Sequence, residues 1–269
     1  MSPASDAAFP DLAPQIPRDL VPLPRAASLL LWASAYLRGD VGPDDAVEIG
    51  LGAGHRHRAG GGADLFDWMT QLRRLPLVSA RLVLPQPGRI AGLIGPPSAI
   101  SRALLAEQAV VVTAAGLAEH TLVPQTEVLG ADAARGVEVT WTQIPGTGAQ
   151  VPPPAYSAGA REELLRALRR AADSAAHLDL VPEEPIPQAS LPPDWTAAGV
   201  PRHVPGPARH LLVLAARTLL LTRAELAEGS SAAGLSGELA REELLRDLAD
   251  AAREALVDQV NLLAAAELG

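Results

Sequence analysis

A proline- and glycine-rich break divides this chain of 269 residues into two stretches with different patterns. The break runs from Pro145 to Tyr156 and contains Gly146, Gly148 and three consecutive prolines at 152–154, which is typical of a semi-rigid linker. Strand-forming patterns precede it, and helical patterns follow it. The sequence therefore predicts an α+β protein with a small mixed sheet packed on helices, followed by a C-terminal antiparallel three-helix bundle.

Four segments follow from this division. Residues 1–24 are rich in Pro, Ala and Asp without periodicity, which predicts a disordered or surface arm. Residues 25–145 form the α/β module, residues 146–157 the Pro/Gly linker and residues 158–269 the helical bundle. Within the last segment, Val181 to Pro207 is proline-rich, so we expect a crossover loop in which Trp195 is an anchor.

Strands and helices of the first module are predicted from local patterns. Apolar or β-branched runs predict four strands, at Arg81–Leu84, Ala109–Thr113, His120–Leu129 and Val137–Ile144. Helical spacing predicts a helix that Pro24 opens and Gly39 caps, and one from Asp64 to Leu75 whose N-terminus Asp64 caps. Ser98 is expected to cap a third helix, over Ala99 to Glu107. The pattern at Asp44 to Ile49 fits a helix or a strand equally well.

The composition excludes several chemistries. All 22 basic residues are arginine and cysteine is absent, so the chain has no Schiff-base or P-loop lysine, no thiol nucleophile and no cysteine-ligated metal. The net charge of −9 argues against nucleic acid and anionic membranes as partners. No apolar run reaches the roughly 18–20 residues of a membrane span. We therefore expect a cytoplasmic protein with no nucleic-acid and no membrane partner.

The sharpest motif is the glycine loop Gly50-Leu51-Gly52-Ala53-Gly54, which follows Val47-Glu48-Ile49. It resembles the first motif of Rossmann-like methyltransferases, in which a strand ending in an acidic residue leads into a Gly-x-Gly-x-Gly loop. The resemblance implies binding of S-adenosylmethionine by Gly50, Gly52 and Gly54. The sequence departs from the family pattern after the loop, where residues 55–62 are a poor helix start and the next apolar run leads into Pro85 with no acidic residue.

A second glycine-rich loop, residues 88–98, joins a predicted strand to a predicted helix. Backbone donors near the helix N-terminus, together with Arg89 and Ser98, would form a cradle for an anion. A rigid Pro/Gly connection that only links the two elements is the alternative. Whether Arg56, Arg58, Arg81 and Arg89 converge into one anion site is left open by the sequence.

A metal site is the weaker interpretation of the histidines. His55 and His57 alternate on one segment and would share a face if it is extended, with Asp64, Asp67 or His120 as a third ligand. The interleaved Arg56 and Arg58 oppose a divalent cation, so we expect no bound metal.

Two functions remain. The favoured hypothesis is a non-catalytic binding or scaffolding protein that acts through contacts with a protein partner or by self-association, because the helices are amphipathic and no complete catalytic constellation is present. It requires no cofactor. The alternative is a small-ligand binding protein or an enzyme that uses the glycine-rich loops at 50–62 or 88–98 for S-adenosylmethionine or an anion.

Overall fold

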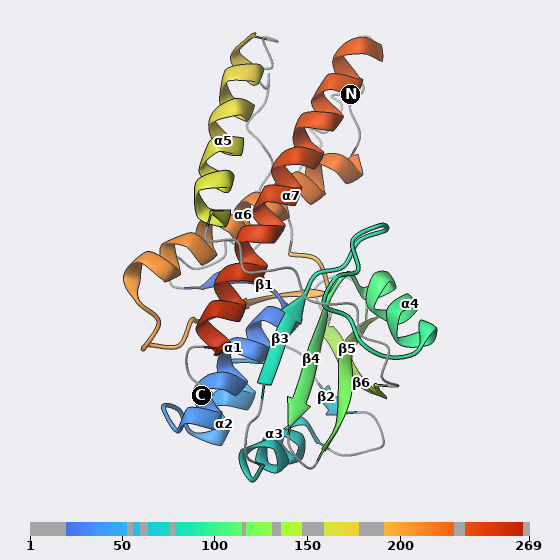
Figure 1. Ribbon diagram of the computed structural model, residues 1–269, viewed down its shortest axis with the longest axis vertical. Coiled ribbons are helices and arrows are strands. Elements are labelled where there is room, and N and C mark those ends of the chain that lie inside the picture. The colour runs from blue at the N-terminus through green and yellow to red at the C-terminus, as the bar shows by residue number, and fades with distance from the viewer. Residues whose placement is uncertain are drawn as a thin grey trace, which may run out of the picture.

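The chain folds into two sheets and seven helices within the ranges that the computed structural model describes, namely residues 20–52, 56–59, 64–75, 79–114, 117–130, 136–146, 159–177, 191–228 and 235–265 (Figure 1). The strands are β1 Val21–Pro24, β2 Arg56–Ala59, β3 Ser79–Val83, β4 Ala109–Ala114, β5 Leu117–Leu129, β6 Gly136–Pro145 and β7 Trp195–Ala198. The helices are α1 Arg25–Arg38, α2 Pro43–Glu48, α3 Leu65–Arg73, α4 Pro97–Ala106, α5 Ala160–His177, α6 Gly206–Glu228 and α7 Leu235–Ala265. The predicted α+β class, with a small mixed sheet packed on helices, is confirmed.

The larger sheet has five strands in the order β2-β6-β5-β4-β3. The β3–β4, β4–β5 and β5–β6 pairs are antiparallel, whereas β2 lies parallel to β6. Short connections join β4 to β5 and β5 to β6 as hairpins, whereas α4 lies in the connection between β3 and β4. The smaller sheet pairs β1 with β7 in antiparallel fashion.

Helices cover both faces of the five-stranded sheet, as Figure 1 shows with α1 and α7 on one side and α4 on the other. The alternating residues of β4 explain the arrangement. Val110 and Val112 point into the core shared with α1 and α7, whereas Val111 points into a second core beneath α4. A strand buried on both faces needs a continuous apolar run, and this accounts for the sequence of β4.

Local capping signals fix the ends of several helices as predicted. Asp64 is the N-cap of α3, and its carboxylate accepts a hydrogen bond from the Phe66 N–H (3.4 Å). Gly39 ends α1 in the left-handed conformation at φ 87°, where glycine has no Cβ penalty. Ser98 differs from prediction, because α4 begins at Pro97 with Pro96 as N-cap and no side-chain cap.

Of the three C-terminal helices, α7 packs against both α5 and α6. In Figure 1, α5 and α7 lie side by side and run in opposite directions. An ion pair between Arg241 of α7 and Glu225 of α6 joins these two helices near their connection. The predicted antiparallel helical arrangement is thus present. None of the helices in the described ranges combines the length and apolarity that a bilayer crossing requires.

Helix α7 also completes the edge of the sheet. The Asn261 side chain accepts a hydrogen bond from the Leu82 N–H (2.6 Å) and donates one to the Leu82 carbonyl (3.0 Å). Both residues are buried. The side-chain amide therefore takes the place of a neighbouring strand at β3, an edge that would otherwise expose unpaired backbone groups.

Three strands lie where the sequence did not predict them, and one of them is β2, within the predicted glycine-rich loop at 50–62. Val21–Pro24, which we assigned to the N-terminal arm, form the fully buried strand β1. Trp195, which we placed in a crossover loop, begins β7 and is 1% exposed. The prediction that strands end at the break near residue 150 is therefore wrong for β7. The boundaries of the predicted domains stay a prediction, and residues 147–157 of the linker lie outside the described residues.

Candidate functional site

The predicted glycine loop is packed against protein in its described part. The Ser28 hydroxyl donates a hydrogen bond to the Gly50 carbonyl, and a Cβ at Gly50 would lie 2.4 Å from the Trp32 Cβ. Gly52 has φ 71°, and a Cβ there would lie 1.7 Å from Thr196 Oγ1. Close approach of the backbone to α1 and β7 thus explains both glycines. Gly54 lies outside the described residues.

The segment before this loop is helical. The methyltransferase resemblance requires a strand at Val47–Ile49, but residues 43–48 form α2. Pro43 occupies the first turn, where its missing N–H is not needed, and Asp44 and Asp45 favour the positive end of the helix dipole. The described geometry thus lacks the strand that would direct the loop toward a nucleoside.

The second predicted loop, residues 88–98, begins with a hydrogen-bonded turn. Gln86 and Arg89 exchange backbone hydrogen bonds of 3.0 and 2.8 Å, and Gly88 between them has φ 81°, the conformation that a type II turn requires. The guanidinium of Arg81 donates two hydrogen bonds to the Gly92 carbonyl (3.0 and 2.9 Å). Arg81 therefore shapes the loop, which accounts for its position without a bound anion.

Arg89 faces acidic residues of another element. Its guanidinium lies 3.1 Å from Asp250 and 3.3 Å from Glu254, both on α7. Because the side chain is 57% exposed, these ion pairs contribute little stability, but they hold Arg89 toward α7. An anion would have to compete with two carboxylates for this arginine.

The start of α4 offers few backbone donors. Pro96 and Pro97 carry no N–H, and the Ala99 N–H donates to the Pro96 carbonyl (2.8 Å). Ser98 supplies the remaining N–H at this end and is exposed. Anion sites at helix ends depend on several convergent N–H groups, so this terminus is a poor phosphate cradle.

The predicted metal ligands do not converge in the described part of the chain. His120 is 1% exposed, and its Nε2 accepts a hydrogen bond from the Trp68 indole (3.2 Å). His55 and the side chain of His57 lie outside the described residues, as do the side chains of Arg56 and Arg58. Among the described residues no group of His, Asp and Glu is placed to hold a metal.

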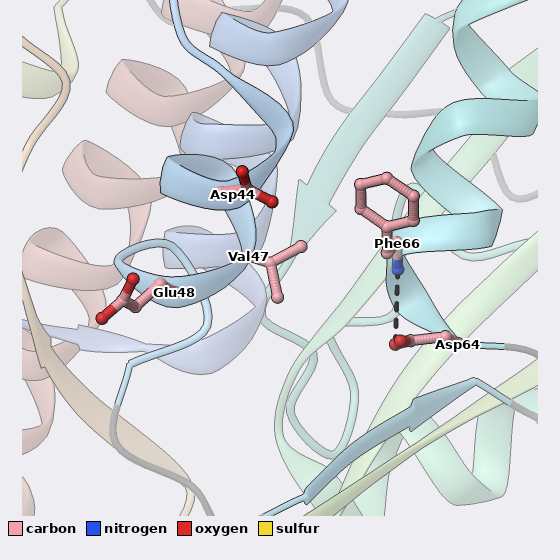
Figure 2. Close-up of a pocket in the computed structure, with 5 residues that line it drawn as sticks. All are labelled: Asp44, Val47, Glu48, Asp64 and Phe66. Carbon is pink, nitrogen blue, oxygen red and sulfur yellow. Dashed lines mark hydrogen bonds between the residues drawn. The ribbon is translucent and has the colours of Figure 1, made fainter.

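One cavity of about 450 Å³ lies between α2 and α3. Its lining is Asp44, Val47, Glu48, Asp64 and Phe66 (Figure 2). Figure 2 shows the Phe66 ring on the α3 side and the two α2 carboxylates on the other side of the cavity. The Asp64 carboxylate is already used as the helix cap. The cavity is thus acidic, unlike either predicted anion site.

A second cavity, of about 430 Å³, is a groove between the end of α4 and strand β5. We call it the α4–β5 groove. Its lining residues are Arg102, Leu105, Ala106, Glu107, Pro124, Gln125, Thr126, Pro193, Asp194 and Arg223. Leu105, at its rim, is 87% exposed, the most exposed of the large apolar side chains described. The groove brings this apolar side chain together with residues from α4, β5, α6 and the 193–194 turn, and we take it as the candidate functional surface.

Ion pairs connect the residues of one wall of the groove. Arg223 of α6 lies 3.1 Å from Asp194 and 3.4 Å from Glu107, and its guanidinium stands over the Trp195 ring at 6.0 Å from the centroid. Beneath this cluster, the Gln108 side chain accepts from the Ala26 N–H and donates to the Asp194 carbonyl (both 2.8 Å). The wall thus joins α6, β7 and the start of β4 in one hydrogen-bonded unit.

Buried charge reinforces the same joint. Arg25 is 3% exposed, and it donates hydrogen bonds to the carbonyls of Pro193 (2.8 Å) and Leu51 (3.3 Å). Burial lowers the pKa of Arg25 to about 10, and attraction to Asp194 opposes that shift. The positively charged form is retained at neutral pH, which keeps these carbonyls satisfied.

Strand β5 extends beyond its neighbour at the groove. Strand β4 pairs with β5 only as far as Leu122, whereas β6 pairs with β5 through Leu129. Within the described residues, the segment from Val123 to Leu129 therefore has a strand on one side only. The chain turns into α4 where β4 would have continued, and this leaves the edge of β5 open beside the groove.

Sequence reasoning did not identify the α4–β5 groove. Its residues carry no motif, and they come from α4, β5, the 193–194 turn and α6. One signal was present. The predicted strand at His120–Leu129 was twice as long as the predicted Ala109–Thr113, and such a mismatch between neighbours leaves an overhang.

Comparison with known proteins gives one match. Residues 26–158 match a family model described as Rv1486c-like protein, N-terminal domain. The matched range takes in the five-stranded sheet and α4, and it leaves out α5, α6 and α7. No curated protein and no solved structure matches the chain.

Proposed function

We propose that this chain is a non-catalytic binding protein whose α4–β5 groove holds a segment of a protein partner. The observation that carries the proposal is the 87% exposure of Leu105 at the groove rim. Leu129, farther along β5 on the same face of the sheet as Val123, is 36% exposed. Apolar side chains spread beyond the groove suit a polypeptide, which covers a wide surface, better than a small molecule enclosed within one cavity.

The small-ligand alternative has less support. Arg89 is directed toward Asp250 and Glu254, and Gly50 and Gly52 approach Trp32 and Thr196 too closely to leave space for a ligand at those positions. Thermal-shift measurements with S-adenosylmethionine and with inorganic phosphate test it directly, because a ligand that binds the folded state raises stability. Stabilisation at saturating concentration of either compound would favour the alternative.

The absence of cysteine and lysine from the sequence allows a clean cross-linking test. A Leu105→Cys variant is labelled with a thiol-directed benzophenone and irradiated in native lysate. We expect one stoichiometric protein adduct, which excess unlabelled wild-type protein abolishes. Leu262→Cys is the matched control, because Leu262 is 57% exposed on α7 and does not line the groove. Equal labelling of proteins by both variants, or none by either, would contradict the proposal.

A further inference from the structure

The open edge of β5 has a defined set of unpaired backbone groups. The Gly146 N–H donates to the Glu119 carbonyl (2.6 Å), so the backbone of Glu119 is directed toward β6. Backbone direction alternates along a strand, and the β5–β6 register is continuous from His120 to Leu129. The backbone groups of Thr126 and Val128 are therefore directed away from β6, toward the side on which β4 has ended.

The position of Pro124 is consistent with these backbone directions along β5. Pro124 is the first residue of β5 after Leu122 whose backbone is directed to the open side, and it has no N–H to leave unpaired there. Proline in a sheet is confined to edges for this reason. The carbonyl of Pro124 and both backbone groups of Thr126 and Val128 remain as a template for one added strand.

Two carboxylates, those of Glu127 and Glu138, lie beside the open edge of β5. Glu127 lies directly opposite Glu138 of β6, and neither carboxylate pairs with a side chain that the structure describes. Like charges in this position destabilise a sheet. On the other side of Glu138 the register position belongs to Arg56 of β2, whereas the position beyond Glu127 is empty among the described strands. A basic residue there would offset the repulsion.

Geometry favours a close ion pair at that position. The backbone of Glu127 is directed toward β6, so a strand added on the open side would meet Glu127 as a non-hydrogen-bonded pair. Side chains are closer together in such pairs than in hydrogen-bonded ones. The acidic residues that line the groove, Glu107 and Asp194, already pair with Arg223. Glu127 is thus a carboxylate that the edge of β5 itself offers to a basic residue.

We propose that the α4–β5 groove binds its partner by strand addition: an extended segment pairs with Pro124–Val128 of β5 and places a lysine or arginine opposite Glu127. This inference rests on the function proposed above and names the kind of partner. A second copy of this chain fits poorly, because two β5 edges paired about Glu127 would bring the two Glu127 carboxylates together. Leu105, on the rim, would contact an apolar side chain of the added segment.

The test uses peptides selected from a displayed library of random ten-residue sequences by the complete chain. We expect apolar and β-branched residues at alternate positions and a basic residue at one fixed position. The selected peptide is then N-methylated at alternate positions, in two sets. The set whose N–H groups face β5 should lose affinity by at least about tenfold, since each methyl removes a backbone hydrogen bond. The other set should bind as before.

Protein variants locate the binding site independently. Thr126→Pro removes an edge N–H without removing a β6 pairing bond and should abolish binding, whereas Thr126→Val keeps the N–H and should not. Glu127→Gln should weaken binding about threefold, the order expected of one cross-strand ion pair. Glu127→Lys should reverse the preference toward a peptide whose basic residue is replaced by Glu.

Each outcome bears on the proposal. Equal loss of affinity from both N-methylated sets, an unchanged affinity in Glu127→Gln and Glu127→Lys, or a dimer of the wild-type chain that Thr126→Pro dissolves would overturn it. If Thr126→Pro fails to fold, the N-methylated peptides still decide, because they leave the protein unaltered. Peptides that bind only when Leu105 is intact but ignore N-methylation would overturn strand addition alone. Failure to select any groove-binding peptide would count against the protein-binding function as well.

Discussion

Replacing Asn261 by alanine should remove the hydrogen bonds that join α7 to strand β3 at the edge of the sheet. The side chain makes two buried hydrogen bonds to the backbone of Leu82, of 2.6 and 3.0 Å, and Leu82 is 1% exposed. The substitution leaves a buried N–H and a buried carbonyl without partners, and each such group costs about 1–3 kcal/mol. We therefore expect the free energy of unfolding to fall by about 3 kcal/mol.

Urea denaturation measures this loss. Far-UV circular dichroism follows the helices, and tryptophan fluorescence follows Trp32, Trp68, Trp141 and Trp195, all of which lie in the core. Both transitions should move to lower urea by about 1 M. Leu262→Ala is the matched control, because the neighbouring Leu262 is 57% exposed and its truncation should change stability by less than about 0.5 kcal/mol. If Asn261→Ala is no more destabilised than Leu262→Ala, the reasoning from the Leu82 hydrogen bonds is refuted.

Three further changes test other contacts. Gly52→Ala should destabilise the fold by about 2 kcal/mol, since a Cβ would meet Thr196 Oγ1 at 1.7 Å and φ is 71°; a thermal melt that matches wild type would contradict this. Trp68→Phe removes the hydrogen bond that His120 accepts and should cost about 1 kcal/mol in urea unfolding; no loss would mean that water replaces the indole. Because burial lowers the pKa of Arg25 to about 10, below its unfolded value, the unfolded state binds more protons between these pKa values. The stability of wild type relative to Arg25→Met should thus rise by about 1 kcal/mol between pH 9 and pH 11, and a flat difference in urea unfolding would exclude the effect.

Local signals predicted several helix ends and most strands of the five-stranded sheet. Asp64 caps α3 and Gly39 caps α1 because capping depends on the residue and its immediate neighbours. The pairing of strands that lie far apart in the sequence could not be predicted from local patterns. Val21 pairs with Ala198, and a four-residue strand that contains Pro22 and Pro24 has no period-2 signal to reveal it.

The candidate site was missed for a related reason. The α4–β5 groove depends on where β4 ends relative to β5, and this is a property of register, which no single residue encodes. The glycine loops drew attention because glycine motifs are conspicuous in a sequence. In the structure, Gly50 and Gly52 serve close packing, which the same residues encode just as well.

The contact between the Asn261 amide and Leu82 can form only late in the synthesis of the chain. It is separated from Leu82 by 179 residues, so a ribosome working at about 5–20 residues per second needs roughly 10–40 seconds after making β3 before the closing helix exists. During that interval the outer edge of β3 is unpaired, and a chaperone or a neighbouring nascent chain can bind there. A chain that terminates before Asn261 would leave the backbone N–H and carbonyl of Leu82 without this partner.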